Sequence, residues 1–137
     1  MTRLNPRTVV MAIAGMAFSV YAFAADAPAP EAKPFRAAYY TCVKASGGVT
    51  AALNDCIGTE HDYQDKRLNT AYQSLRKSLS TAQRNALRDE ERAWIGDRDK
   101  KCAPDPDGGT GSMLDSNQCA LSETAERAAT LEARITK

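Results

Sequence analysis

The segment of the sequence that concentrates potential chemistry is EERAWIGDRDKKC, residues 90–102. It holds the single tryptophan, Trp94, between Glu91 and Arg98, and it ends at Cys102. On a helix these four residues and Leu87 are three or four positions apart, so they share one face. Two charges on a face that meets a partner helix indicate either an acid or base site or a buried structural pair.

Catalysis is the less favoured of these interpretations. It needs a positioned nucleophile, or an acid and a base that face each other in a cleft. The only histidine, His61, stands between Glu60 and Asp62 on what we expect to be a solvated helix face. Glu90 and Glu91 are adjacent, so their side chains point about 100° apart on a helix. The sequence therefore predicts that the protein is not an enzyme.

Metal binding is not expected either. Four cysteines could hold zinc, but they are widely spaced, form no C-x-x-C pair and have one histidine to join them. A calcium loop starting at Asp105 would need Gly at its sixth position and Glu at its twelfth, where the sequence has Thr110 and Ser116. We predict no metal and no cofactor.

The spacing of apolar residues predicts an all-α fold with three main helices. A first helix begins near Val49, and one of its faces carries Leu68, Tyr72, Leu75 and Leu79. Ser80 and Gln83 form an S-x-x-Q capping box, which starts a second helix at about Thr81. The short connection predicts an antiparallel hairpin. The second helix ends near Lys101, and the Gly- and Pro-rich segment 103–118 is expected to be a loop. A third helix then carries Leu121, Ala125, Ala128, Leu131 and Ile135 on one face.

The start of the chain predicts export. Arg3 and Arg7 precede an apolar run, and Ala22-Phe23-Ala24 is typical of a signal-peptidase site. We therefore expect a signal peptide at 1–24, a flexible Ala- and Pro-rich leader at 25–34 and a helical domain at 35–137. No cysteine lies near the cut, so the protein is predicted to be periplasmic or secreted and not a lipoprotein.

The charge balance argues against two classes of partner. Without residues 1–24 the chain has 16 basic and 17 acidic residues, and overall the basic residues are interspersed with acids. This mixture predicts neither nucleic-acid binding nor a polybasic membrane patch. We expect a monomer.

An even number of cysteines in an exported chain indicates disulfides. Pairs Cys42–Cys56 and Cys102–Cys119 are favoured, since both close short loops; a Cys56–Cys102 pair remains an alternative. These bonds would fasten the ends of the helical domain.

The hairpin geometry also predicts partners for the two charges of the opening segment. If the turn lies near Ser80, Arg98 faces Asp62 or Asp65 and pairs with one of them. Glu91 then lies near Asn69 and accepts a hydrogen bond from it.

Several motifs together resemble the LprI-type lysozyme inhibitor family of bacterial envelope proteins. They are C at 42, LNDC at 53–56, D-x-x-L-N-x-x-Y-x-x-L at 65–75, R-A-W-I-x-x-R-D-x-x-C at 92–102, C at 119 and T-x-x-R-x-x-x-L at 124–131. The residues expected to have structural roles in this pattern are Asp65, Leu68, Asn69, Tyr72, Glu91, Trp94, Arg98 and Asp99. Glu91 stands where the family usually has Gln, and the lipidation cysteine of some members is missing.

The resemblance implies a small exported helical protein that binds and inhibits lysozyme without a cofactor. A lysozyme cleft works through two carboxylates, and a protein loop can occlude it. Residues 105–116 are the candidate loop, with Asp105, Asp107, Gly108, Gly109, Ser112 and Met113 as candidate contacts. The alternatives are that this segment is only a connector, or that the partner is another cell-wall hydrolase or a secreted effector.

Overall fold

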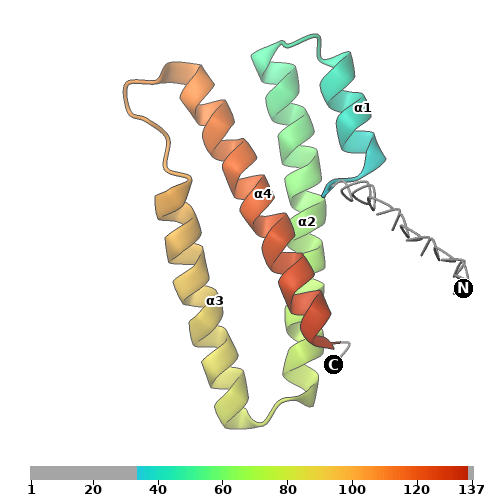
Figure 1. Cartoon of the computed structure of the whole chain (residues 1–137), viewed down its shortest axis with the longest axis vertical. Helices are drawn as coiled ribbons and strands as arrows, with labels where there is room; N and C mark the ends of the chain where they lie inside the picture. Colours follow the sequence, from blue (N-terminus) through green and yellow to red (C-terminus); the bar gives the residue numbers. More distant parts are fainter. Residues whose placement is uncertain (1–33, 136–137) are drawn as a thin grey trace, which may run out of the picture. The chain divides into compact units, whose positions relative to one another are not determined.

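The computed structural model describes residues 34–135, and every regular element in that range is a helix (Figure 1). The helices are α1 (Ala37–Ala45), α2 (Thr50–Ser78), α3 (Thr81–Lys101) and α4 (Gly109–Ile135). The predicted all-α class and both favoured disulfides are confirmed. The predicted signal peptide, and the predicted leader up to residue 33, lie outside the described residues.

The predicted antiparallel hairpin is formed by α2 and α3, which run in opposite directions on either side of a tight turn (Figure 1). Ser80 caps α3 as expected, because its Oγ accepts from the Gln83 backbone N–H and the Gln83 side chain accepts from the Ser80 N–H. The capping box therefore sets the start of α3 at Thr81.

The segment before α2 was not predicted to be a helix, yet it forms α1. Gly47 and Gly48 have φ values of +60° and +82°, which allow the sharp reversal between α1 and α2. The Cys42–Cys56 disulfide joins the two helices, and the Tyr39 hydroxyl donates to Gln118 of α4 at 2.5 Å. The domain therefore has four helices instead of three.

The expected loop at 103–118 is mostly wrong, because α4 begins at Gly109. Only residues 102–108 connect α3 to α4. The first turns of α4 contain Gly, Ser and Thr, which favour a helix weakly. Contact with α2, such as the 2.7 Å hydrogen bond from Asn117 to Asn54, stabilises this part of the helix despite its composition.

The core forms where α4 packs along α2 and where α3 reaches both. On α2, Leu68 and Leu75 are buried while Tyr72 and Leu79 pack at the edge, so the predicted face is confirmed. On α4 the buried residues are Leu121, Ala125, Ala128 and Leu131. The last member of that predicted face, Ile135, is the final residue of α4 and is 46% exposed, in an open hollow that it lines together with residues of α2. From α3, Leu87 is buried and Trp94 packs on the same cluster.

Candidate functional site

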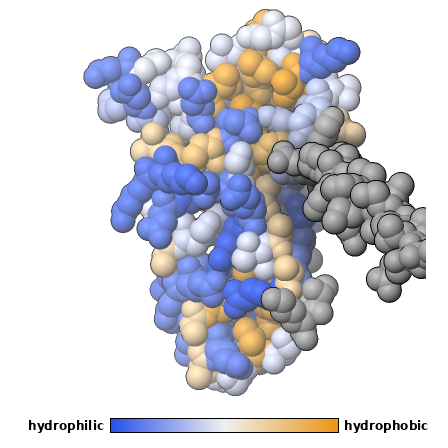
Figure 2. Space-filling model, viewed as in Figure 1, coloured by the Kyte–Doolittle hydropathy of each residue, from blue (hydrophilic) through white to orange (hydrophobic). Residues whose placement is uncertain are grey.

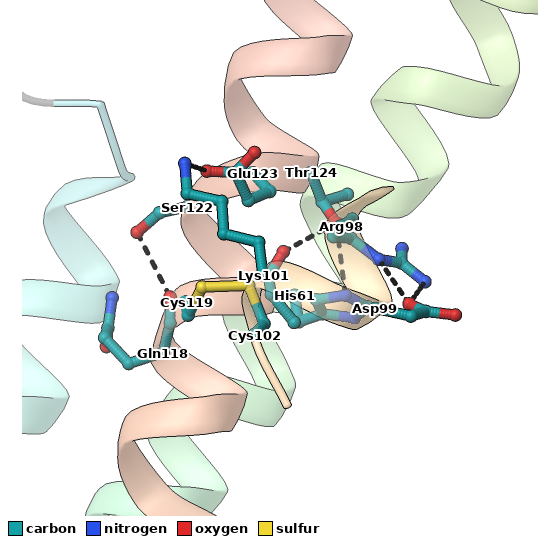
Figure 3. Close-up of a disulfide and its surroundings, with 11 residues drawn as sticks. His61, Arg98, Asp99, Lys101, Cys102, Gln118, Cys119, Ser122, Glu123 and Thr124 are labelled. Carbon is teal, nitrogen blue, oxygen red and sulfur yellow. Dashed lines mark hydrogen bonds and ion pairs between the residues drawn. A yellow bond between two sulfur atoms is a disulfide. The ribbon is translucent and has the colours of Figure 1, made fainter. Parts of the chain in front are cut away.

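The Cys102–Cys119 disulfide fastens the C-terminal end of α3 to α4 and thereby holds the connection between them (Figure 3). Cys102 is buried, and the two Cα atoms are 5.5 Å apart. Beside the bond, Lys101 of α3 pairs with Glu123 of α4 at 2.5 Å, and this carboxylate raises the pKa of the Lys101 ammonium. The disulfide therefore holds both the start of the connection, at Cys102, and the helix α4 that follows it.

The connection itself is exposed but ordered by local hydrogen bonds. Asp105 accepts from the backbone N–H of Asp107 on its side chain and from Gly108 on its carbonyl oxygen. The Asp105 N–H donates to Ser112 Oγ, which ties the loop to the first turn of α4. Of the candidate contact residues, three lie in this loop and three, Gly109, Ser112 and Met113, lie in α4. The candidate segment 105–116 is thus a short loop followed by a helix end.

An apolar hollow of about 340 Å³ opens beside this loop. It is lined by the first turns of α2 and α4, through Thr50, Ala51, Asn54, Thr110, Met113 and Leu114. Met113 is 52% exposed, and Val49, which precedes α2, is 60% exposed. Figure 2 shows apolar residues gathered at this end of the molecule. Large exposed apolar side chains in a group indicate a surface that a partner covers.

A second, polar hollow of about 370 Å³ adjoins the first at Asn54. It lies between three helices and is lined by Asn54, Ile57, Gly58, His61 and Asp62 of α2, Arg98 of α3, and Asn117 and Ala120 of α4. The His61 ring lies 3.4 Å from the Thr124 hydroxyl (Figure 3). The Asp62 carboxylate has no hydrogen-bond or ion-pair partner among residues 34–135. This hollow therefore offers both donors and acceptors to a partner.

The predicted pairing of Arg98 with Asp62 or Asp65 is wrong. Arg98 does line the same hollow as Asp62, but its guanidinium donates to Asp99 on its own helix at 2.8 and 3.0 Å (Figure 3). The group also lies 5.1 Å from the centre of the Trp94 ring. A neighbouring carboxylate and an aromatic face hold Arg98, so it does not need a partner on α2.

The predicted bond from Asn69 to Glu91 is also wrong, because the partner of Glu91 lies on α4. Arg127 donates to Glu91 through Nε at 3.0 Å and through Nη2, and to Glu90 at 2.6 Å. Glu91 is 8% exposed, and its Oε2 is buried without a hydrogen bond. A Gln here would offer one neutral acceptor, whereas the carboxylate compensates the buried charge of Arg127.

This network shifts two pKa values. Burial acts to raise the pKa of Glu90, but hydrogen bonds and charge from Arg127 and Arg134 outweigh it and lower that pKa. Burial acts to lower the pKa of Arg127, but Glu91 and Glu90 outweigh it and raise that pKa. The ion pairs between α3 and α4 therefore favour the charged forms of Glu90 and Arg127.

Glu60 was expected on a solvated face with Asp62, and this is wrong, since Glu60 is 1% exposed. It accepts from the Arg36 backbone N–H and Nε, and from Gln64. The Arg36 guanidinium lies 3.9 Å from the Tyr63 ring centre. Glu60 thus holds the segment before α1 against α2 and is closed to a partner.

The other motif residues of α2 act within the helix. Asn69 donates to the Asp65 carboxylate at 2.8 Å, one turn earlier, and both are exposed. Tyr72 packs against the core with Arg76 above its ring. Asp65, Asn69 and Tyr72 add no group to the two hollows.

Sequence reasoning missed the amides of Asn54 and Asn117 and the place of His61. Asn54 was visible in the LNDC motif, but nothing in the sequence paired it with α4. His61 was visible as the single histidine, but its meeting with Thr124 depends on how α4 packs.

Within residues 34–135 no three His, Cys, Asp or Glu side chains gather as they would around a metal ion. In the same range, no helix combines the length and the apolar character needed to cross a membrane.

Comparison with known protein families shows to which family the chain is related. Residues 42–131, more than half of the chain, match the family described as lysozyme inhibitor LprI. The chain belongs to the LprI family. The match begins at one disulfide and extends past the other, so it includes the part of this LprI chain that holds both hollows. No curated protein and no solved structure matches the chain.

Proposed function

We propose that this LprI-family protein is exported and binds a lysozyme, whose cleft it blocks without catalysis or a cofactor. The observation that carries the proposal is the family match over residues 42–131. We place the contact surface at one end of the molecule, which we call the loop end. It consists of the 102–108 connection with Asp105, Asp107 and Gly108, of Met113 near the start of α4, and of the apolar and polar hollows beside them.

The chemistry of the loop end supports this assignment. Exposed Val49 and Met113 supply apolar area that a partner can bury. Residues 102–126 contain five acidic residues and no Lys or Arg, and three of the acids, Asp105, Asp107 and Asp115, are exposed on the connection and the first turns of α4. Anionic charge of this kind steers a cationic lysozyme toward the site and suppresses contact with anionic proteins.

The order of the loop supports occlusion. Its backbone is already fixed by Asp105, Ser112 and the Cys102–Cys119 bond. A fixed loop loses little conformational freedom on binding, and such preorganisation raises affinity. A projecting loop that enters the cleft would keep the glycan from the two catalytic carboxylates of the lysozyme.

The direct test follows the clearing of a cell-wall suspension by c-type and by g-type lysozyme, with and without the purified, oxidised protein. We expect at least one class to be inhibited at micromolar protein. Absence of inhibition of both classes would contradict the proposal and favour another cell-wall hydrolase or a secreted effector as the partner.

The contact surface is tested by two matched variants on α4. Met113 and Ile135 are both exposed apolar residues, 52% and 46%, near opposite ends of this helix. Met113→Asp should weaken inhibition about tenfold or more, since a charge replaces an apolar contact at the interface. Ile135→Asp should leave inhibition unchanged. Equal effects of the two variants would place the contact elsewhere.

The acidic residues are tested separately. Asp105→Lys with Asp107→Lys should lower the association rate and reduce its dependence on salt, measured by biolayer interferometry. Unchanged association rates would show that the Asp105 and Asp107 carboxylates do not contribute to the contact.

A further inference from the structure

The turn between α2 and α3 carries a concentration of positive charge that the whole-chain balance hides. Residues 66–88 contain six Lys and Arg and no Asp or Glu. This segment includes the last turns of α2, the Ser80 turn and the first turns of α3. It lies at the end of the molecule opposite the α3–α4 connection (Figure 1).

Three of these cations converge at the turn. Arg76, Lys77 and Arg84 line one shallow hollow of about 350 Å³ together with Gln73. Arg84 Nε donates to the Leu79 carbonyl oxygen at 2.8 Å, and the Arg76 guanidinium lies 5.5 Å from the Tyr72 ring centre. Both guanidinium groups are thus positioned by neutral partners. We call Arg76, Lys77 and Arg84 the basic tip.

In the described part of the chain, the three cations of the basic tip form no ion pair, unlike Arg67 and Arg88 of the same segment. Arg67 pairs with Glu132, and Arg88 pairs with Asp89. By contrast, no carboxylate within residues 34–135 forms an ion pair with Arg76, Lys77 or Arg84. An anion brought to this site displaces no internal partner.

We propose that the basic tip docks on the surface of a bilayer that contains anionic phospholipids, with lipid phosphates as the ligands. Each Lys or Arg close to an anionic leaflet is attracted to it, and the attractions of neighbouring cations add up. A nucleic acid, in contrast, is bound through several phosphates along its length, and the tip offers a single spot. This differs from the expectation of no membrane patch, which rested on the balance of the whole chain.

The proposal does not depend on lysozyme inhibition. Because the basic tip and the loop end lie at opposite ends of the α2–α3 hairpin, docking would leave the loop end free. The protein would then be concentrated at the membrane while its other end meets a partner.

The test is co-sedimentation of the purified, oxidised protein with vesicles of phosphatidylglycerol and phosphatidylcholine, and with pure phosphatidylcholine vesicles. We expect binding only to the anionic vesicles, with loss of most binding between 50 mM and 500 mM NaCl. Equal binding to both vesicle types would overturn the proposal, and so would no binding to anionic vesicles at 50 mM NaCl.

Variants locate the surface. Arg76→Gln, Lys77→Gln and Arg84→Gln combined should weaken vesicle binding about a hundredfold. The matched control removes three exposed cations elsewhere, Lys44→Gln, Arg92→Gln and Lys100→Gln, and should keep at least a third of the affinity. If the two triple variants lose affinity equally, net charge and not the tip is responsible, and the proposal fails.

Two further measurements complete the test. Arg76→Lys with Arg84→Lys should retain binding, since lipid phosphates need only a point charge; loss of binding in this variant would contradict the proposal. A duplex DNA fragment that binds as tightly as the anionic vesicles, and loses affinity in the tip variant, would overturn the assignment to lipid. Circular dichroism confirms that each variant is folded.

Discussion

The two ends of the α2–α3 hairpin are ordered in different ways. At the basic tip, order comes from the Ser80–Gln83 capping box and from the core residues Leu75 and Leu87 just behind it. At the loop end, the Cys102–Cys119 disulfide replaces such packing, and apolar side chains such as Met113 remain exposed.

This difference explains how a domain of this size can keep apolar side chains exposed to solvent. Covalent fastening restricts the unfolded chain, so it stabilises a segment without burying the segment's side chains. The loop end can therefore keep its apolar and acidic groups for a partner. The tip has no such bond, and its apolar residues face inward while its cations face solvent.

The largest effect on the free energy of unfolding is expected from the ion pair between Arg127 and Glu91. Arg127→Ala removes the partner of buried Glu91 and should lower the free energy of unfolding by about 3–5 kcal/mol. Urea denaturation followed by circular dichroism measures it. Arg134→Ala, at the exposed edge of the same network, should cost less than about 1 kcal/mol. If both variants lose a similar free energy of unfolding, the buried pair of Arg127 and Glu91 contributes no more than the exposed pair of Arg134 and Glu90.

The next effect concerns the loop end alone. Cys102→Ser with Cys119→Ser should lower the free energy of unfolding by about 3 kcal/mol and weaken lysozyme inhibition. Vesicle binding by the basic tip should persist under conditions where the variant is folded. Retained inhibition at full strength would show that the disulfide is not needed to order the loop.

A smaller effect is expected at the tip. Ser80→Ala removes the side-chain acceptor of the capping box and should cost about 1 kcal/mol. Ser80→Gly is the matched control, with an expected cost of a few tenths of a kcal/mol. Thermal unfolding compares the two, and equal melting temperatures would show that the cap contributes nothing here.

The smallest effect is a pH dependence at Glu90. Its pKa is lower in the folded protein, so its contribution to stability is present above the ordinary Glu pKa of about 4.3 and is lost as the pH falls through the folded value. Stability of the wild type should therefore fall more than that of Glu90→Gln between pH 6 and pH 3. The difference should stay below about 1 kcal/mol because the side chain is 45% exposed. Parallel curves would contradict this.

Local patterns could be predicted because they depend on residues close in sequence. The capping box fixed the start of α3, and the apolar spacing identified Leu68 and Leu75 as buried. The partner of Glu91 could not be predicted in this way. A hairpin drawn from two helices alone offered Asn69, whereas α4 packs along α2 and presents Arg127 to Glu91.

The loop shows the same limit. Its Gly and Pro content predicted irregular backbone to residue 118, but packing on α2 extends α4 back to Gly109. Helix propensity is a weak local preference, and tertiary contact overrides it.

For this protein the sequence by itself determined the all-α class, the helix cap at Ser80 and the family motifs, and it favoured the two disulfide pairs that the structure shows. Each of these depends on spacing or on residue type along the chain. Only the tertiary structure decided which charges are buried together, where α4 begins and which amides line the polar hollow. Those features depend on how α4 packs against residues that are far from it in the sequence. The free energy of that packing cannot be predicted from any one segment of the chain.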